Sequence, residues 1–362
     1  MPDIRVLSAF PSGQTSGGDP PVNPMPRTFV LAVLLCAPLG SLDARAQNFA
    51  AQRVRLGTLA PQGTSYHRIL LEMGEQWRNG TGGKVQMTVY AGTMGSEVEV
   101  VRRMRLGQLQ AGTLTVIGLR EIDPAVSALQ QMPMMFRSLA ELEYVRGQLE
   151  PKLAERLAER GFHVLFWGDA GWVRYFSRHP AVMPDDFRRM KVFVTAGDTK
   201  QLDLMKSAGY QPVSLEWTDA LTALQTGMID AVPTIPYFAL AGQYYSVAKH
   251  MLEVNWAPLV GATIISKRAW DAFSPETQVV LREAAAAAGI KFQESGRTES
   301  DEAVAAMQKR GLTVTPMTPA AEDAWRRMAE GFYPELRGSM VPADMFDEVV
   351  RLLAEYRART RQ

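Results

Sequence analysis

Arg174 is the side chain in this chain that is best suited to bind a charged small molecule. It stands between Trp172 and Tyr175, after a predicted strand HVLFW, in the segment WGDAGWVRYFSRHPAVMPDDFRRMKVFV. A guanidinium keeps its charge and offers a planar fork of donors that matches a carboxylate. The alternative is a surface arginine whose stem covers the neighbouring rings. The first interpretation predicts a carboxylate clamp on one wall of a ligand cleft.

Patterns typical of catalytic and metal sites are missing. The sequence has no G-x-S-x-G, H-E-x-x-H, Walker or G-x-G-x-x-G motif, and no two of its four histidines have metal-ligand spacing. Asp185 and Asp186 follow Pro184, as in a helix cap. We therefore expect a protein that is not an enzyme and that holds no cofactor and no metal. An exported enzyme with Asp185, Asp186 or Glu216 as its base is the alternative.

Composition places the chain among ordinary soluble globular proteins. It has 362 residues, of which 46% are hydrophobic and 21% charged, and its net charge is +1. This length is sufficient for two lobes. The near-neutral balance argues against nucleic acid as a partner, because that role normally needs a basic face.

The N-terminus resembles a leader for export. From Met25, one positive charge at Arg27 precedes an apolar run at 29–39, and Ala-Arg-Ala at 44–46 forms an A-x-A cleavage site. The run is too short to span a bilayer. We expect cleavage after Ala46, with translation starting at Met1 or at Met25. The only cysteine, Cys36, would then be lost from the exported protein.

Strands and helices alternate along the chain, which is typical of an α/β sheet. The five residues from Gly107 to Ala111 resemble those from Gly227 to Ala231, and each group follows a helix and enters an apolar strand. This repetition suggests two lobes of similar construction. Strands are predicted at 53–59, 85–89, 114–117, 163–167, 190–194, 212–215, 229–232 and 259–265, and 244–251 is predicted to be helical.

A long helix begins at Ser274, with Ser as its N-cap and Pro275 in the first position. It is predicted to run to Lys309, about 35 residues or roughly 50 Å, which is longer than one lobe is wide. We therefore expect it to cross between the lobes. Two further helical patterns, 319–332 and 342–359, are expected to pack on the outside.

A ligand of such a fold lies between the lobes, where loops leave the strand ends. Aromatic residues gather in the last three of these loops, and core packing is the alternative role for Trp172 and Trp217. The loops predicted to line the cleft are 59–64, 91–96, 115–118, 167–176, 215–217 and 232–237.

Several motifs resemble one known family in the same order along the chain. They are TGGKVQMTVYAGTMGSEVEVVRRMRLGQLQAG, MPMMFRSLAELEYV, MPDDFRRMKVFV and PVSLEWTDALTALQTGMIDAV. Over about residues 53–312 the chain resembles the solute-binding subunit of tripartite ATP-independent periplasmic (TRAP) transporters, the dicarboxylate-binding-protein family.

The resemblance implies an α/β, two-lobed periplasmic-binding-protein-like fold with a hinge and a long helix crossing both lobes. It implies a periplasmic protein that captures a small organic solute and delivers it to the membrane permease subunits. We expect a monomer, and pairing through the C-terminal helix is the alternative. The alternatives are a sensing subunit for a membrane signalling partner and a protein that binds no small molecule. The implied layout is a leader at 1–46, lobe one at 48–171 plus 260–299, lobe two at 172–259 plus 300–354, and a tail at 355–362.

The family's ligand contacts carry over only in part. Its first arginine matches Arg174, but its principal clamping arginine, in a K-[IV]-R-V pattern, is replaced by Phe193 in Lys-Val-Phe-Val. Trp217 matches the family's aromatic, Thr234 stands where the family often has asparagine, and Thr115 follows the third strand. The predicted ligand-binding residues are Leu59, Thr115, Trp172, Arg174, Phe193, Trp217, Thr234 and Tyr237.

The exchange at Phe193 changes the expected ligand. Charge-assisted hydrogen bonds from an arginine contribute roughly 1.5–3 kcal/mol each. A buried phenylalanine instead contributes roughly 1.5–3 kcal/mol through apolar area. We therefore expect a monocarboxylate or a less acidic solute, with an apolar part facing Phe193 and at most one carboxylate on Arg174. Phe193, Trp172, Trp217 and Tyr237 could then form an aromatic pocket.

Overall fold

The structure is a computed structural model that describes residues 51–360. The predicted leader, the cleavage site after Ala46 and Cys36 lie outside the described residues. Within residues 51–360, none of the helices combines the length and the apolar composition that crossing a bilayer requires.

One mixed sheet runs through the described chain. Its strand order is β2-β1-β3-β8-β4-β7-β5-β6, and β9 pairs with β8. Parallel pairs at the two ends flank an antiparallel centre formed by β3, β8, β4 and β7. The strands are β1 Gln52–Thr58, β2 Val85–Ala91, β3 Ala111–Thr115, β4 Phe162–Ser177, β5 Lys191–Thr195, β6 Gln211–Leu215, β7 Ala231–Thr234, β8 His250–Ser266 and β9 Thr313–Thr315.

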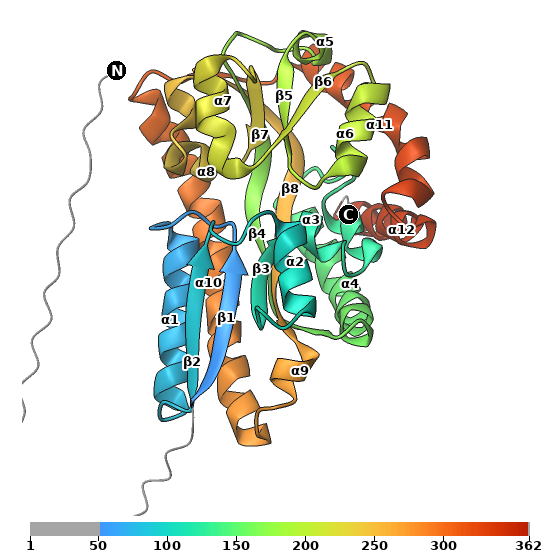
Figure 1. Ribbon diagram of the computed structural model, residues 1–362. Helices are drawn as coiled ribbons and strands as arrows, with labels where there is room; N and C mark the ends of the chain where they lie inside the picture. The colour runs from blue at the N-terminus through green and yellow to red at the C-terminus, as the bar shows by residue number, and fades with distance from the viewer. Residues whose placement is uncertain (1–50, 361–362) are drawn as a thin grey trace, which may run out of the picture. The chain divides into compact units, whose positions relative to one another are not determined.

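Helices cover both ends of this sheet (Figure 1). The α-helices are α1 Ser65–Gly80, α2 Glu97–Arg105, α3 Val116–Leu119, α4 Leu139–Glu159, α5 Pro184–Arg188, α6 Thr199–Ser207, α7 Ala220–Thr226, α8 Pro236–Ala241, α9 Lys267–Trp270, α10 Pro275–Gln308, α11 Pro319–Ser339 and α12 Ala343–Arg359. Three short 3₁₀ segments are η1 Pro124–Leu129, η2 Trp217–Asp219 and η3 Tyr244–Ser246.

Two lobes share the sheet, and β4 and β8 pass through both of them (Figure 1). Lobe one, the lower part of the figure, is built on β1, β2 and β3, and buried side chains from α1, α2 and α4 fill its cores. Lobe two is built on β5, β6 and β7 with α6 and α7. The predicted α/β fold with two lobes is therefore confirmed.

The two long strands differ from the sequence-based prediction. β4 was expected to end at Trp167, yet it continues to Ser177, and β8 begins at His250, within a segment predicted to be helical. The glycines and the aspartate near the middle of β4 suggest a loop by sequence. In the structure Gly171 has a φ of +83° at an irregularity of the ladder, a conformation that glycine adopts without strain.

Helix α10 crosses between the lobes as predicted. Ser274 caps it by accepting from the Thr277 amide, and its 34 residues span about 51 Å. Two of its glycines allow close packing against β4. A Cβ at Gly289 would lie 2.8 Å from Phe166 Cβ, and one at Gly296 would lie 2.6 Å from the carbonyl oxygen of Asp169.

The C-terminal helices pack on different lobes. On α11, Trp325 is buried and donates to the Val182 carbonyl oxygen of lobe two at 2.8 Å. On α12, buried side chains join the core of α4, and Arg357 binds Glu141 at 2.7 Å. α12 therefore lies against lobe one rather than in lobe two, and it continues to Arg359 where a tail was predicted. The remaining lobe boundaries stay a prediction.

Candidate solute-binding site

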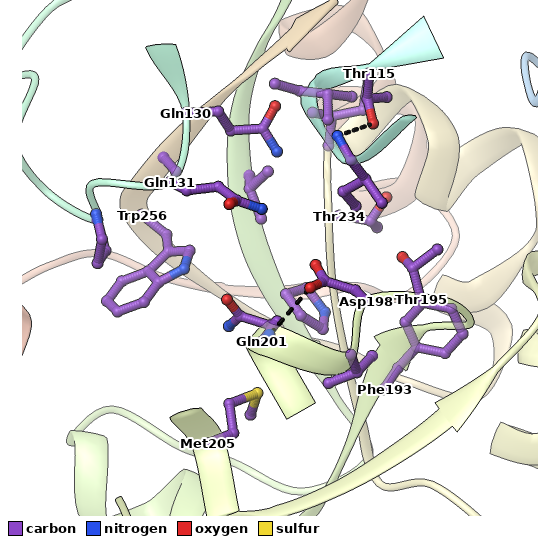
Figure 2. Close-up of a pocket in the computed structure, with 18 of the residues that line it drawn as sticks. Thr115, Gln130, Gln131, Phe193, Thr195, Asp198, Gln201, Met205, Thr234 and Trp256 are labelled. Carbon is purple, nitrogen blue, oxygen red and sulfur yellow. Dashed lines mark hydrogen bonds between the residues drawn. The ribbon is translucent and has the colours of Figure 1, made fainter. Parts of the chain in front are cut away.

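A cavity of about 220 Å³ lies between the lobes, and side chains from both lobes line it. Among the lining residues that Figure 2 labels, Thr115, Thr195 and Thr234 lie at the ends of strands, and Asp198 and Gln201 lie at the start of α6. Such a position, outside the strand ends, is where small ligands bind in α/β folds.

Glu97 and Thr115 form a polar corner on lobe one. The Glu97 carboxylate accepts from the Thr115 amide at 2.8 Å, from Thr115 Oγ1 at 2.6 Å and from the Gly118 amide at 2.9 Å. Burial raises the pKa of Glu97, although these hydrogen bonds and the nearby charge of Arg120 oppose the rise. Because both of its oxygens are engaged, Glu97 orders its own turn and presents no free acceptor to a solute.

Two glutamines after η1 supply uncharged donors from lobe one. Gln130 Oε1 accepts from the Val260 amide at 2.9 Å, which leaves the Gln130 amide nitrogen to face the cavity. The side chain of Gln131 also reaches toward the cavity (Figure 2), and its buried Oε1 has no hydrogen-bond partner among the described residues. A buried polar atom without a partner is costly, so a bound solute or water that donates to it would be stabilising.

Aromatic rings form the wall on lobe two. The ring centroids of Phe193 and Trp217 lie 4.4 Å apart, and Tyr244 stacks beyond Trp217 at 6.3 Å. Phe193 is buried on β5, where it also packs against Ala220 and Leu224 of α7. This wall offers ring faces and apolar area, as predicted for the exchange at Phe193.

The opposite end of the cavity is apolar and rich in methionine. Met205 of α6 and Met328 of α11 line it together with Trp256 of β8. Methionine side chains are flexible and polarisable, so they adapt to solutes of different shape. The cavity therefore has two apolar ends with a polar belt between them.

Asp198 and Gln201 complete that belt on lobe two. Asp198 caps α6 by accepting from the Gln201 amide at 3.0 Å, and its Oδ1 accepts from Arg120 of lobe one at 2.6 Å. The two side chains of this ion pair are only 5% and 6% exposed. Arg120 itself is not part of the cavity lining.

Five of the eight predicted ligand-binding residues line the cavity, and three do not. The lining set from the prediction is Leu59, Thr115, Phe193, Trp217 and Thr234, contributed by both lobes. Trp172 packs against the core of lobe one. Tyr237 accepts from the Ser65 amide at 2.8 Å and packs edge-on against Tyr66.

Arg174 is not among the residues that line the cavity. Its neighbours Val173 and Tyr175 line it, whereas the Arg174 guanidinium approaches Glu253 at 3.4 Å. Burial lowers the pKa of Arg174, against the charges of Glu253 and Asp301. The ligand role expected for Arg174 stays a prediction.

Sequence reasoning missed Gln130, Gln131, Asp198 and Gln201. The helix cap Asp198-Thr199-Lys200 is visible in the sequence and could have placed Asp198 at a helix start. The two glutamines follow a 3₁₀ turn that no sequence pattern predicts. Among the side chains that the structure describes, at 51–296 and 298–360, no arginine or lysine lines the cavity, and no group of three His, Cys, Asp or Glu could hold a metal ion.

Comparison with known proteins decides the family. Residues 56–338 match the model of the bacterial extracellular solute-binding protein family 7. The chain belongs to this family. It is therefore a solute-binding protein of a transport family, and the predicted TRAP resemblance is confirmed.

The curated relatives have low sequence identity to this chain, but the alignments cover most of the length of each relative. The C4-dicarboxylate-binding periplasmic protein of Rhodobacter capsulatus is 23% identical over 268 residues, covering 73% of this chain and 79% of that protein. The 2,3-diketo-L-gulonate-binding periplasmic protein of Escherichia coli is 23% identical over 270 residues, covering 74% and 82%.

Solved structures share the fold at low identity. A TRAP solute-binding protein from Sulfurospirillum deleyianum with bound succinate has a TM-score of 0.76 at 18% identity, covering 83% of this chain and 99% of that one. An extracytoplasmic solute receptor from Bordetella pertussis that binds pyroglutamic acid has a TM-score of 0.76 at 19% identity, covering 84% and 100%. These likenesses confirm the two-lobed fold.

Proposed function

We propose that this chain is exported, loses its leader after Ala46, and acts in the periplasm as a monomer that delivers a small organic solute to a TRAP-type permease. The observation that carries the proposal is the cavity between the lobes, with walls from both. A solute that contacts both walls stabilises the closed form, because it binds that form better than the open one. The family and the named relatives support transport rather than catalysis.

We infer that the solute bears no more than one carboxylate and has a large apolar part. Relatives with bound succinate or pyroglutamic acid support a carboxylate. The aromatic and methionine-rich ends of the cavity support apolar contact, and the amide of Gln130 is an uncharged donor for one carboxylate oxygen. A second carboxylate would find no cation among the described side chains that line the cavity, and a buried carboxylate without a cation is strongly unfavourable.

Thermal unfolding of the exported protein with matched solutes tests this inference. Hexanoate and 3-phenylpropionate are compared with adipate and succinate, which have two carboxylates. A solute at 100 times its Kd stabilises the folded state by about 2.7 kcal/mol. We expect the monocarboxylates to raise the melting temperature and the dicarboxylates to leave it unchanged. Tight binding of succinate, with no response to hexanoate or 3-phenylpropionate, would contradict the inference.

Delivery to a permease is tested separately. Vesicles that contain the permease subunits are loaded with an ion gradient and supplied with the labelled solute found in the thermal screen. Uptake that depends on adding this protein supports delivery. A solute that binds tightly but is never taken up would instead favour a sensing role for the same fold.

A further inference from the structure

Asp198 is a charged side chain of the cavity with an oxygen left for a ligand. Its Oδ1 is engaged by Arg120 Nη2 at 2.6 Å and by the Gln201 amide at 3.0 Å. Among the side chains that the structure describes, none donates to its Oδ2, and the residue, whose side chain is 5% exposed, lines the cavity. Figure 2 shows this carboxylate directed into the space between Gln131 and Gln201.

Glu97, the other carboxylate of the cavity, does not offer the same contact. Three donors from Thr115 and Gly118 occupy its oxygens, and it is 2% exposed. The two acids are similarly buried. They differ in that both oxygens of Glu97, but only one oxygen of Asp198, accept hydrogen bonds from the protein. A carboxylate oxygen that lines a cavity and receives no donor from the protein can accept a hydrogen bond from a ligand or from water.

We propose that Asp198 Oδ2 accepts a hydrogen bond from a hydroxyl or ammonium group of the solute. This inference rests on the proposed function and adds to it the chemical class of the solute. The solute has an apolar body, at most one carboxylate and, beside the apolar body, a group that donates a hydrogen bond. The donor contacts lobe two while the carboxylate takes the uncharged amide donors of lobe one.

The surroundings of Asp198 fit such an amphipathic solute. Phe193 and Trp217 lie on one side of the polar belt, and Met205 and Trp256 lie on the other. A hydroxyl or ammonium group between apolar walls gains a charge-assisted hydrogen bond from Asp198. An analogue without that group leaves the carboxylate oxygen without its donor, so the site binds the analogue more weakly.

Arg120 connects this contact to closure of the lobes. It lies at the end of α3 in lobe one, whereas Asp198 caps α6 in lobe two, so their 2.6 Å contact requires the lobes to be close together. The guanidinium holds Oδ1 and thereby turns Oδ2 toward the solute. Arg120 is accordingly a positioning residue, since it does not line the cavity.

The probes are three solutes with the same phenyl ring and carboxylate. 3-Phenylpropionate has hydrogen at carbon two, 3-phenyllactate has a hydroxyl there, and phenylalanine has an ammonium. Isothermal titration of the exported protein is expected to give at least a tenfold lower Kd for phenyllactate or phenylalanine than for phenylpropionate. The hydroxyl and ammonium arms identify which donor the site takes.

Asp198→Asn is the decisive variant, because asparagine also caps helices and has a similar shape. It is expected to abolish the preference for the ammonium and to weaken that for the hydroxyl at least tenfold. Asp203→Asn removes an exposed charge from the same helix, α6, and is expected to change no Kd. Arg120→Gln is expected to reduce the donor preference, and Arg120→Lys to restore part of it, which a purely structural role would not predict.

Equal Kd values for the three probes in the wild type would overturn the inference, as would an unchanged preference in Asp198→Asn with an unchanged melting temperature. If none of the three binds while hexanoate does, the inference about Asp198 fails and the proposed function stands. If no solute of either panel binds, the proposed function fails with it.

Discussion

Two arginine–carboxylate pairs lie close to the cleft and differ in nearly every respect. Arg120 and Asp198 meet at 2.6 Å with side chains 6% and 5% exposed, and they join one lobe to the other. Arg174 and Glu253 meet at 3.4 Å with side chains 15% and 47% exposed, on neighbouring strands β4 and β8. The first pair connects the two lobes, whereas the second lies between two neighbouring strands of the sheet.

The difference shows that the position of an arginine in the fold decides its role more than its sequence context does. A pair within one sheet keeps its geometry whether the lobes are open or closed, so it carries no information about the ligand. A pair between lobes forms only when they meet. The free energy of the pair therefore contributes to closure of the lobes. In this protein the pair also orients Asp198 Oδ2 in the cavity.

Loss of Arg120 should have the largest effect of the changes considered. Arg120→Ala leaves Asp198 buried without its cation and removes a charge that also acts on Glu97. Breaking one partner of a buried pair costs about 3–5 kcal/mol. We expect urea unfolding to show a loss of this size. A loss below about 1 kcal/mol would mean that the pair is no more buried in solution than Arg174 and Glu253.

An arginine at position 193 should sharpen the contrast. Phe193→Arg places a guanidinium on the cavity side of β5, where the family's principal arginine stands, at the cost of apolar packing in lobe two. One charge-assisted bond contributes about 1.5–3 kcal/mol, so succinate affinity should rise roughly tenfold to a hundredfold. Titration with succinate measures it. Phe193→Leu, which adds no charge, should show no gain.

Glu97 should make the stability of the wild type depend on pH. Burial raises its pKa in the folded protein, so the folded state holds the Glu97 proton more tightly than the unfolded state does. The stabilisation from this group is complete below its unfolded pKa and is lost as pH rises through its folded pKa. We expect the free energy of unfolding, relative to Glu97→Gln, to be higher at pH 4 than at pH 7.5. An opposite slope in urea titrations would contradict burial as the dominant cause.

Loss of Arg174 should have the smallest effect. Its side chain lies outside the cavity, and its partner Glu253 is half exposed, so Arg174→Ala should cost about 1 kcal/mol or less. Carboxylate affinity should stay within about twofold of the wild type, because about 1.4 kcal/mol would be needed for a tenfold change. A tenfold or greater loss of affinity in titration would restore Arg174 as the clamp that the sequence suggested.

Much of the fold could be predicted because local patterns and tertiary structure agree. The cap at Ser274 and the apolar periodicity beyond it define α10, and alternation defines β1 and β2. β4 could not be predicted in full. Its middle contains Gly168, Asp169 and Gly171, which favour a turn, and only pairing with β8 on one side and β7 on the other keeps it extended.

The parts of the site that follow from the order of motifs along the chain could be predicted. The parts that depend on which side chains of an element reach the cavity could not. Phe193 and Trp217 line the cavity as expected, because each follows a recognisable strand or turn. Arg174 does not line the cavity although its neighbours Val173 and Tyr175 do, and the sequence does not show which side chains of a long strand reach a cavity. Asp198 and Arg120 are 78 residues apart in sequence, and no local pattern connects them.

The way β4 and β8 traverse both lobes has a mechanical consequence. The two strands are paired from Phe162 and Ser266 at one end to Ser177 and His250 at the other, with register shifts near Gly171. Opening of the cleft must therefore bend the hydrogen-bonded ribbon of β4 and β8, since the lobes are not joined by a flexible linker there. A paired two-stranded ribbon resists large bending. Release of the solute would therefore depend on how far β4 and β8 can bend at the irregularity near Gly171.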